Sequence, residues 1–229
     1  MQSHQSSRRN IFEETLSTVL RRISLGQYIR GEKLPAERDL AIELGVSRST
    51  LRDVLGELQT TGILEISRGR YGGARVVGLP SDYERHKSVK PEDLDDALRF
   101  REVIEVAAVR LATEATLSAG QRRHLHEACN ACTSAEEDAY RQFDSRFHIA
   151  IAEVSGIPSL ISAVSNVRER INSLLDSIPM ISVNLTHANE QHQAILSAIL
   201  SGDTGAAERL TIEHTSGTAT LLRGYLLHS

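Results

Sequence analysis

Three histidines and one aspartate in the C-terminal half of the chain are the residues best suited to chemistry. Asp144 and His148 are four positions apart, which puts them on one face of a helix. His192 and His214 each lie in an apolar helical pattern, so we expect all four side chains to face the interior of a helical bundle. Imidazole and carboxylate groups together suit Zn²⁺, Ni²⁺ or Mn²⁺, with coordination positions left open. On spacing alone, three unrelated histidines with water partners are the alternative.

Arg101 is a candidate for binding a small ligand. It shares a helical stripe with Leu94 and Glu105, so its guanidinium is expected to face inward. An inward arginine could hold a carboxylate through two hydrogen bonds. An ion pair with Glu105, one helical turn later, is the alternative.

A second group of residues suits DNA. Hydroxyl and guanidinium side chains crowd one short stretch: Ser47, Arg48, Ser49, Thr50 and Arg52. Such groups contact phosphates and base edges, and the N-terminus of a helix adds partial positive charge. Arg38, a little earlier in the chain, is expected to point at the DNA backbone or the same groove.

A glycine-rich turn follows, with Arg68, Gly69 and Arg70 at its tip and Arg75 beside it. Glycines allow such a tip to approach DNA closely, and arginines suit a narrow minor groove. The turn therefore predicts a wing. A solvated basic hairpin on a protein-binding domain is the alternative.

The elements that position the DNA-contact residues follow from caps and breaks. Asn10 is a candidate N-cap for a first helix, and Pro35 opens a second over 36–44 that Gly45 ends. Ser47 caps a third helix that runs from Arg48 to about residue 60. Short apolar runs at 63–66 and 74–77 predict a pair of strands. Helix, tight turn and capped helix form the helix-turn-helix plan.

The rest of the chain is expected to be helical. Apolar periodicity and breaks predict helices at 92–117, 119–133, 136–155, 158–177, 184–201 and 203–226. Short connections favour antiparallel neighbours in a bundle. The predicted fold class is mainly α: an N-terminal winged helix-turn-helix and a C-terminal all-helical antiparallel bundle. The predicted domains are 1–78 and 92–229, joined by a linker over 79–91.

Composition agrees with two functions on one chain. The 229 residues carry a net charge of −4, but residues 1–78 hold 12 Lys and Arg against 9 Asp and Glu, while 79–229 hold 14 against 21. A basic part that precedes an acidic part suits DNA binding by the first. No run of about 18 apolar residues and no apolar signal core occurs, which predicts a cytoplasmic protein.

The pair Cys129 and Cys132 forms a single Cys-x-x-Cys motif. No second cysteine pair and no βαβ pattern accompanies it, so it indicates two small residues on an alanine-rich helix rather than a redox or metal site.

Residues 11–78 resemble the winged helix-turn-helix of the GntR family of bacterial regulators. The resemblance rests on Leu-Pro-Ala-Glu-Arg-Asp-Leu-Ala at 34–41, Leu-Gly-Val-Ser-Arg-Ser-Thr-Leu-Arg at 44–52, and Gly-Ile-Leu at 62–64. It implies DNA contacts by Arg38, Arg48, Ser49, Thr50 and Arg52, and a wing tip at Gly69. It also implies a homodimer on a short palindromic operator.

Residues 92–229 resemble the FCD effector domain of the FadR-like branch of that family. The segments that carry it include Arg-Glu-Val-Ile-Glu at 101–105, Phe-Asp-Ser-Arg-Phe-His at 143–148, His-Gln-Ala-Ile-Leu at 192–196 and Glu-His at 213–214. Metal-binding members use one Asp and three His, which correspond to Asp144, His148, His192 and His214. The resemblance implies a divalent ion, most simply zinc, and a small carboxylate effector.

The resulting hypothesis is a DNA-binding transcriptional regulator, in the family's common mode a repressor, whose operator affinity responds to a small organic acid at a metal site. A metal-dependent, hydrolase-like enzyme with a DNA-binding appendage is the alternative, because a metal with open positions can activate water. No nucleophile motif or phosphate-binding glycine loop supports it, so we expect no enzymatic activity.

Overall fold

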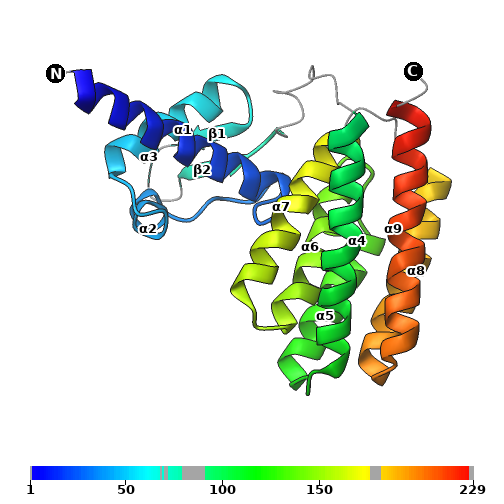
Figure 1. Cartoon of the computed structure of the whole chain (residues 1–229). Coiled ribbons are helices and arrows are strands. Elements are labelled where there is room, and N and C mark those ends of the chain that lie inside the picture. The colour runs from blue at the N-terminus through cyan, green and yellow to red at the C-terminus, as the bar shows by residue number, and fades with distance from the viewer. Residues whose placement is uncertain (1, 68, 70–71, 79–90, 176–181, 227–229) are drawn as a thin grey trace. The chain divides into compact units, whose positions relative to one another are not determined.

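A computed structural model describes residues 2–67, 69, 72–78, 91–175 and 182–226. The chain divides into two compact units, Met1–Arg85 and His86–Ser229 (Figure 1). Of the predicted linker over 79–91, only Pro91 lies within the described residues, where it is the first residue of a helix.

The first unit holds helices α1 (Gln2–Ser24), α2 (Glu37–Glu43) and α3 (Arg48–Thr60), followed by strands β1 (Leu64–Ser67) and β2 (Gly73–Val76). The strands pair antiparallel, with Leu64 opposite Val76 and Ser67 opposite Gly73. The helices and strands share one aliphatic core that includes Val19, Leu40, Leu51 and other fully buried side chains. This arrangement is the predicted helix-turn-helix with a two-stranded wing.

Local sequence explains where α2 ends and α3 begins. Gly45 has a φ of 67°, a left-handed conformation that glycine adopts without a steric penalty. Ser47 then caps α3, because its hydroxyl accepts a hydrogen bond of 3.1 Å from the backbone N–H of Thr50. Leu51, Val54, Leu55 and Leu58 are buried at helical spacing. The apolar face of α3 therefore packs into the core and its polar face is left to solvent.

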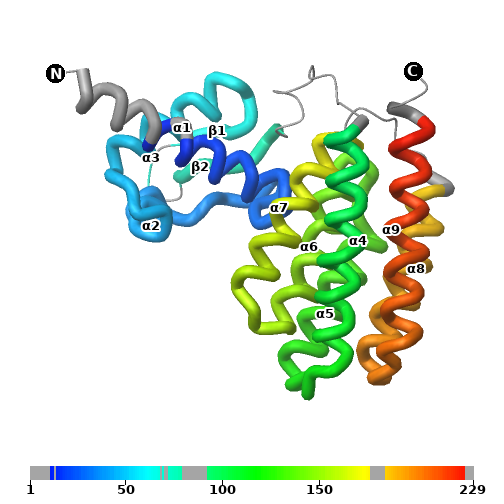
Figure 2. The backbone as a smooth tube through the Cα atoms, viewed as in Figure 1, coloured from blue at the N-terminus to red at the C-terminus, as the bar shows by residue number. Residues whose placement is uncertain are grey.

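The second unit is a bundle of α4 (Pro91–Glu114), α5 (Ala119–Thr133), α6 (Tyr140–Val154), α7 (Pro158–Leu175), α8 (Ser182–Ser201) and α9 (Thr204–Leu226). Helices far apart in the sequence lie side by side, notably α4 with α9 and α4 with α7 (Figure 2). Gly156 and Gly202 follow α6 and α8 with φ of 65° and 76°, which allows the sharp reversals between neighbours. None of the described helices combines the length and apolar character that a membrane span requires.

The predicted elements are present, with two notable shifts. The first helix begins at Gln2, so Asn10 lies inside α1 and the prediction of an N-cap there was wrong. The first ten residues are almost all polar, so no apolar periodicity marked them as helical. The helix predicted from residue 136 begins at Tyr140, because residues 137–139 form a turn.

Candidate metal centre and DNA-binding face

The residues predicted to contact DNA lie on the solvent side of the first unit. Ser47, Arg48, Ser49 and Arg52 are exposed at the start of α3, and Thr50 is half-buried. The hydroxyl of Ser47 also lies 2.8 Å from those of Ser49 and Thr50, which orders this first turn. Arg38 is exposed on α2 and pairs with Asp39 at 3.0 Å. Two guanidinium groups and several hydroxyls thus share one exposed helix end, the chemistry that phosphates and base edges require.

Glu37 is a member of this face that the sequence did not reveal. Its Oε1 lies 2.9 Å from Nη2 of Arg52 and 3.5 Å from Nη2 of Arg48. One carboxylate at the start of α2 therefore contacts both arginines of α3. The contact fixes the direction of two long side chains that would otherwise be free in solvent.

The predicted wing is described in part. Gly69 lies between β1 and β2 with a φ of 105°, and a Cβ there would meet nothing within 4 Å. This open, left-handed position agrees with a hairpin tip. Arg68 and Arg70 lie outside the described residues. Arg75 is exposed on β2 and its guanidinium donates to the carbonyl of Gly31.

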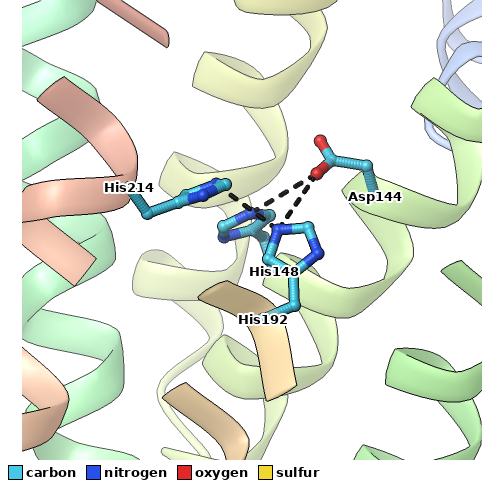
Figure 3. Close-up of side chains that lie close together, drawn as sticks. All are labelled: Asp144, His148, His192 and His214. Atoms are coloured by element: carbon cyan, nitrogen blue, oxygen red, sulfur yellow. Dashed lines mark hydrogen bonds and ion pairs between the residues drawn. The ribbon is translucent and has the colours of Figure 1, made fainter. Parts of the chain in front are cut away.

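The four candidate metal ligands converge from three helices of the second unit. Asp144 and His148 come from α6, His192 from α8 and His214 from α9 (Figure 3). One ligand atom from each residue lies within 4.8 Å of all the others. The Nε2 of His192 lies 3.3 Å from Oδ1 of Asp144 and 3.4 Å from Nε2 of His214. The Nε2 of His148 lies 3.8 Å from the same Oδ1.

Each histidine is held by its outer nitrogen. Nδ1 of His148 lies 3.2 Å from Oε2 of Glu105, and Nδ1 of His214 lies 3.0 Å from Oε1 of Gln191. Nδ1 of His192 lies 3.7 Å from Sγ of Cys132. The Gln191 oxygen can accept a hydrogen bond from Nδ1 of His214, and the negative Glu105 carboxylate lies against Nδ1 of His148, so both favour a proton on Nδ1. The Nε2 lone pairs then face the cluster, where that of His214 also meets Nη2 of Arg101. Orientation of this kind is typical of metal-binding histidines.

The donor set fits a divalent ion. Bonds from zinc to histidine nitrogen or carboxylate oxygen are about 2.0–2.2 Å, so two ligands of one ion are at most about 4.4 Å apart. The separations of 3.3, 3.4 and 3.8 Å lie inside that limit, and the outer bound of 4.8 Å for the whole set lies slightly above it, so binding of an ion would draw the ligands together by a few tenths of an ångström. Nε2 of His148 is buried and has no hydrogen-bond partner among the described residues. An ion at the centre would give that nitrogen a partner.

Two buried arginines adjoin the cluster. Arg101 and Arg168 are each 1% exposed. Arg101 contacts both Glu105, at 3.1 Å, and Nε2 of His214, at 3.2 Å. The ion pair with Glu105, which was the alternative to effector binding, therefore exists. Nη1 of Arg101 is still without a hydrogen-bond partner in the described part of the chain.

Arg168 was missed by the sequence reasoning. It donates a short hydrogen bond to Oδ2 of Asp144 and lies 3.6 Å from Oε1 of Glu105. Its local sequence looks charged, but it belongs to a buried helical stripe: Val164, Val167, Arg168, Ile171 and Leu174. That periodicity was the available signal.

Burial and charge set the protonation of the cluster. Burial lowers the pKa of His148 to about 4. Burial also lowers the pKa values of His192 and His214 well below the usual histidine value, and neighbouring positive charges lower them further. Burial alone would raise the pKa of Glu105, but Arg101, His148 and Arg168 outweigh it and bring the pKa to about 2. At neutral pH the three imidazoles are therefore neutral and Glu105 is ionised. Neutral imidazoles are the form that binds metal.

The cysteine pair adjoins this site without forming a disulfide. Cys129 and Cys132 are buried and free. Burial raises their thiol pKa values to about 11 and 12 respectively, so both are protonated at neutral pH. A protonated, buried thiol is a poor nucleophile and a poor metal ligand, which agrees with the structural interpretation of the pair.

A cavity of about 380 Å³ opens beside the cluster. Its charged wall includes Arg101, Asp144, Arg168 and His214, and its other walls come from α7, α8 and α9. Because two of the four candidate ligands, Asp144 and His214, line the same space as both buried arginines, a small anion in this cavity could contact these four residues. The cavity is therefore the candidate effector site.

Family models match both units. Residues 13–76 match the model described as "Bacterial regulatory proteins, gntR family", and residues 96–217 match the "FCD domain". The chain is 32% identical, over 95% of its length and 88% of the relative's, to a regulatory protein of Escherichia coli K12 named for the L-lactate dehydrogenase operon. It is 29% identical to the Glc operon transcriptional activator of the same organism, over 92% of this chain and 88% of the relative.

A third relative is the HTH-type transcriptional regulator LutR of Bacillus subtilis, 25% identical over 89% of this chain and 97% of LutR. Among solved structures, Escherichia coli McbR/YncC matches with a TM-score of 0.58 and 21% identity, over 93% of this chain and 97% of that one. This structural likeness supports the fold. The sequence relatives are transcriptional regulators and not enzymes.

Proposed function

This chain belongs to the GntR family of bacterial regulators and carries an FCD domain, and we propose that a divalent metal ion and a small organic acid in the helical unit control its binding to an operator. The protein is a DNA-binding transcriptional regulator, as its family models and relatives establish. The metal, the acid and their coupling to DNA are the proposed part.

The observation that carries the proposal is the convergence of Asp144, His148, His192 and His214 beside two buried arginines. Arg168 compensates the buried carboxylate at Oδ2, whereas Oδ1 faces His192 and His148 and is available to a cation. A bound divalent ion would supply positive charge and open coordination positions for an anion. Three nitrogen donors and one oxygen donor favour zinc, with nickel or manganese as the other candidates.

The effector is proposed to be a small carboxylate. Arg101 lines the cavity, and its Nη1 is buried and has no hydrogen-bond partner among the residues described, so we expect it to donate to an incoming anion. Two relatives are named for the L-lactate dehydrogenase and Glc operons, which agrees with regulation of organic-acid metabolism.

The DNA contacts are proposed to come from α3, with Arg48, Ser49, Thr50 and Arg52 in the major groove. The N-terminal end of a recognition helix contacts only a few base pairs, so a homodimer on a short palindromic operator would double the contacts. Arg38, Ser47, Gly69 and the arginines Arg68 and Arg70 are the additional contact candidates. A chromosomal operator implies a cytoplasmic protein.

Effector binding and operator binding must affect each other equally if they are coupled. We propose that the acid shifts helices of the bundle and changes the spacing of the two recognition helices in the dimer, which releases DNA. The protein would then act as a repressor. One curated relative is an activator, so the direction of the effect requires its own measurement.

Selection from a random duplex pool with the full-length chain, followed by fluorescence anisotropy, tests this function. We expect an inverted-repeat consensus whose affinity for the protein falls at least fivefold when an organic acid such as lactate is added. Enrichment of no sequence would contradict operator binding. A consensus whose affinity is unaffected by any acid in a panel would contradict effector control and leave DNA binding in place.

A further inference from the structure

Along three helices of the cavity wall, a charged or polar residue at one end is followed about two turns away by a leucine, with Asn184 and Thr220 beside two of these leucines. On α7 the cavity is lined by Arg168 and, two turns later, by Leu175. On α9 it is lined by His214 and, again two turns later, by Leu221. On α8, which runs the other way, Gln191 is at the charged end and Leu185 lies about two turns earlier. Two helical turns span ~10 Å.

The three leucines lie toward the same end of the bundle. The C-terminal ends of α7 and α9 and the start of α8 meet there (Figure 1). Leu175, Leu185 and Leu221 are each partly exposed, as expected of side chains that face open space rather than the packed core. The space between charged and leucine ends is longer than a three-carbon acid, which would occupy the charged end alone.

Gly217 keeps this space open. It lies in α9 between His214 and Leu221 and lines the cavity. Glycine inside a helix is destabilising relative to alanine, so a packing or functional reason is expected for it. Close packing is not that reason, because a Cβ at this position would meet nothing within 4 Å. The effect of the glycine is to leave room midway along the cavity.

We propose that this cavity selects organic acids that carry an apolar substituent of roughly four to six carbon atoms beyond the carboxylate. This inference rests on the proposed function, in which the carboxylate contacts Arg101 at the charged end. The substituent then extends past Gly217 and contacts Leu175, Leu185 and Leu221. Acids without such a substituent bind weakly, because they leave the apolar wall in contact with water.

Titration calorimetry with a series of 2-hydroxy acids tests the proposal on the full-length chain, purified without chelators. The probes are lactate, 2-hydroxybutyrate, 2-hydroxyhexanoate and 2-hydroxyoctanoate. Each buried methylene is expected to raise affinity roughly fourfold, so 2-hydroxyhexanoate binds on the order of 50-fold tighter than lactate. Affinity that is highest for lactate and falls with length overturns the apolar selection and leaves the proposed function intact. Binding of none of the acids overturns both.

A matched pair of variants locates the effect. Gly217→Leu places a side chain in the open space and improves helix propensity, so it is expected to fold. It reduces the preference for 2-hydroxyhexanoate over lactate to below about fivefold. Gly224→Leu makes the same exchange on the same helix, where a Cβ also meets nothing within 4 Å but the residue does not line the cavity. The Gly224→Leu control is expected to keep the full preference for 2-hydroxyhexanoate over lactate. An equal preference in the two variants would overturn the assignment of the apolar substituent to the space beside Gly217.

Discussion

Oδ1 of Asp144 lies 3.3 Å from Nε2 of His192, although the two residues come from helices that are separated in the chain by a third. The same oxygen faces His148, while Oδ2 of Asp144 accepts from Arg168. One carboxylate thus has an oxygen directed at two of the three imidazoles and an oxygen held by a buried cation. This division keeps the first oxygen available for a metal ion and orders the second.

Substitution of Arg48 tests the DNA-binding face. Arg48→Ala is expected to weaken operator binding by about 1–3 kcal/mol, or roughly 5- to 150-fold, because it removes a guanidinium from the exposed end of α3. Fluorescence anisotropy with the selected operator measures the change. Arg209→Ala, at an exposed position on α9, is the control and keeps wild-type affinity. Unchanged operator binding by the Arg48 variant would refute the groove assignment.

Glu37 is expected to act through the arginines that it contacts. Glu37→Gln removes a negative charge, so affinity for scrambled DNA is expected to rise. It also removes the carboxylate that contacts Arg48 and Arg52, so the preference for the operator over scrambled DNA is expected to fall several-fold. The ratio of the two affinities at fixed salt is the measurement. Glu43→Gln removes the same charge from the same helix, where the carboxylate contacts Arg22 instead. If both variants lower the ratio equally, Glu37 contributes only charge and no orientation.

Arg168 is expected to be essential for stability when no metal is present. Arg168→Met leaves Asp144 without its buried cationic partner, whereas Glu105 keeps Arg101, and the cost of breaking such a pair is about 3–5 kcal/mol. Urea unfolding in the presence of a chelator measures it. Arg170 lies on the same helix as Arg168 and forms an exposed ion pair with Asp96 of α4. Arg170→Met removes that pair and costs at most about 1 kcal/mol. Similar costs for the two variants would contradict the buried network.

Acid is expected to destabilise the chelator-treated protein. The folded-state pKa values of His148, His192 and His214 lie below those of the unfolded chain, so the unfolded chain binds more protons as the pH falls. Stability is therefore lost as the pH falls below the unfolded pKa of about 6.5, and for His148 the loss, at most about 1.4 kcal/mol per pH unit, ends near pH 4. Urea unfolding at pH 7.5, 6 and 5 gives the slope.

His148→Gln should reduce that slope, whereas His124→Gln, at an exposed ion pair with Glu153, should leave it unchanged. A stability that is constant between pH 7.5 and 5 would show that the three imidazoles are not held neutral in the fold.

The fold could be predicted from sequence because its signals are local. Gly45 and Ser47 mark the turn and the cap of α3, and both behave as expected. Repeated apolar positions defined the bundle helices to within a few residues. The start of α1 was missed because its first turns are polar and carry no apolar stripe.

For the candidate site, the sequence predicted the four ligand residues and the inward position of Arg101, but not the contacts that orient them. His192 and His214 stood out because a histidine within an apolar stripe needs a partner. Which nitrogen faces inward depends on Glu105 and Gln191, and their contacts join residues far apart in the chain. Arg101 could not be assigned to one role from spacing, since its Nε contacts Glu105 while its Nη2 contacts His214. A planar guanidinium can serve both partners at once.

Metal content per chain tests the central claim most directly. Elemental analysis of untagged protein, purified without chelators, is expected to find about one zinc, nickel or manganese ion per chain, and His192→Ala is expected to lose most of it while α3 still binds DNA. Wild-type protein that holds no divalent ion, even after incubation with each of these metals, would contradict the account. The four converging side chains would then be a structural network, and DNA binding would have to be controlled without a metal.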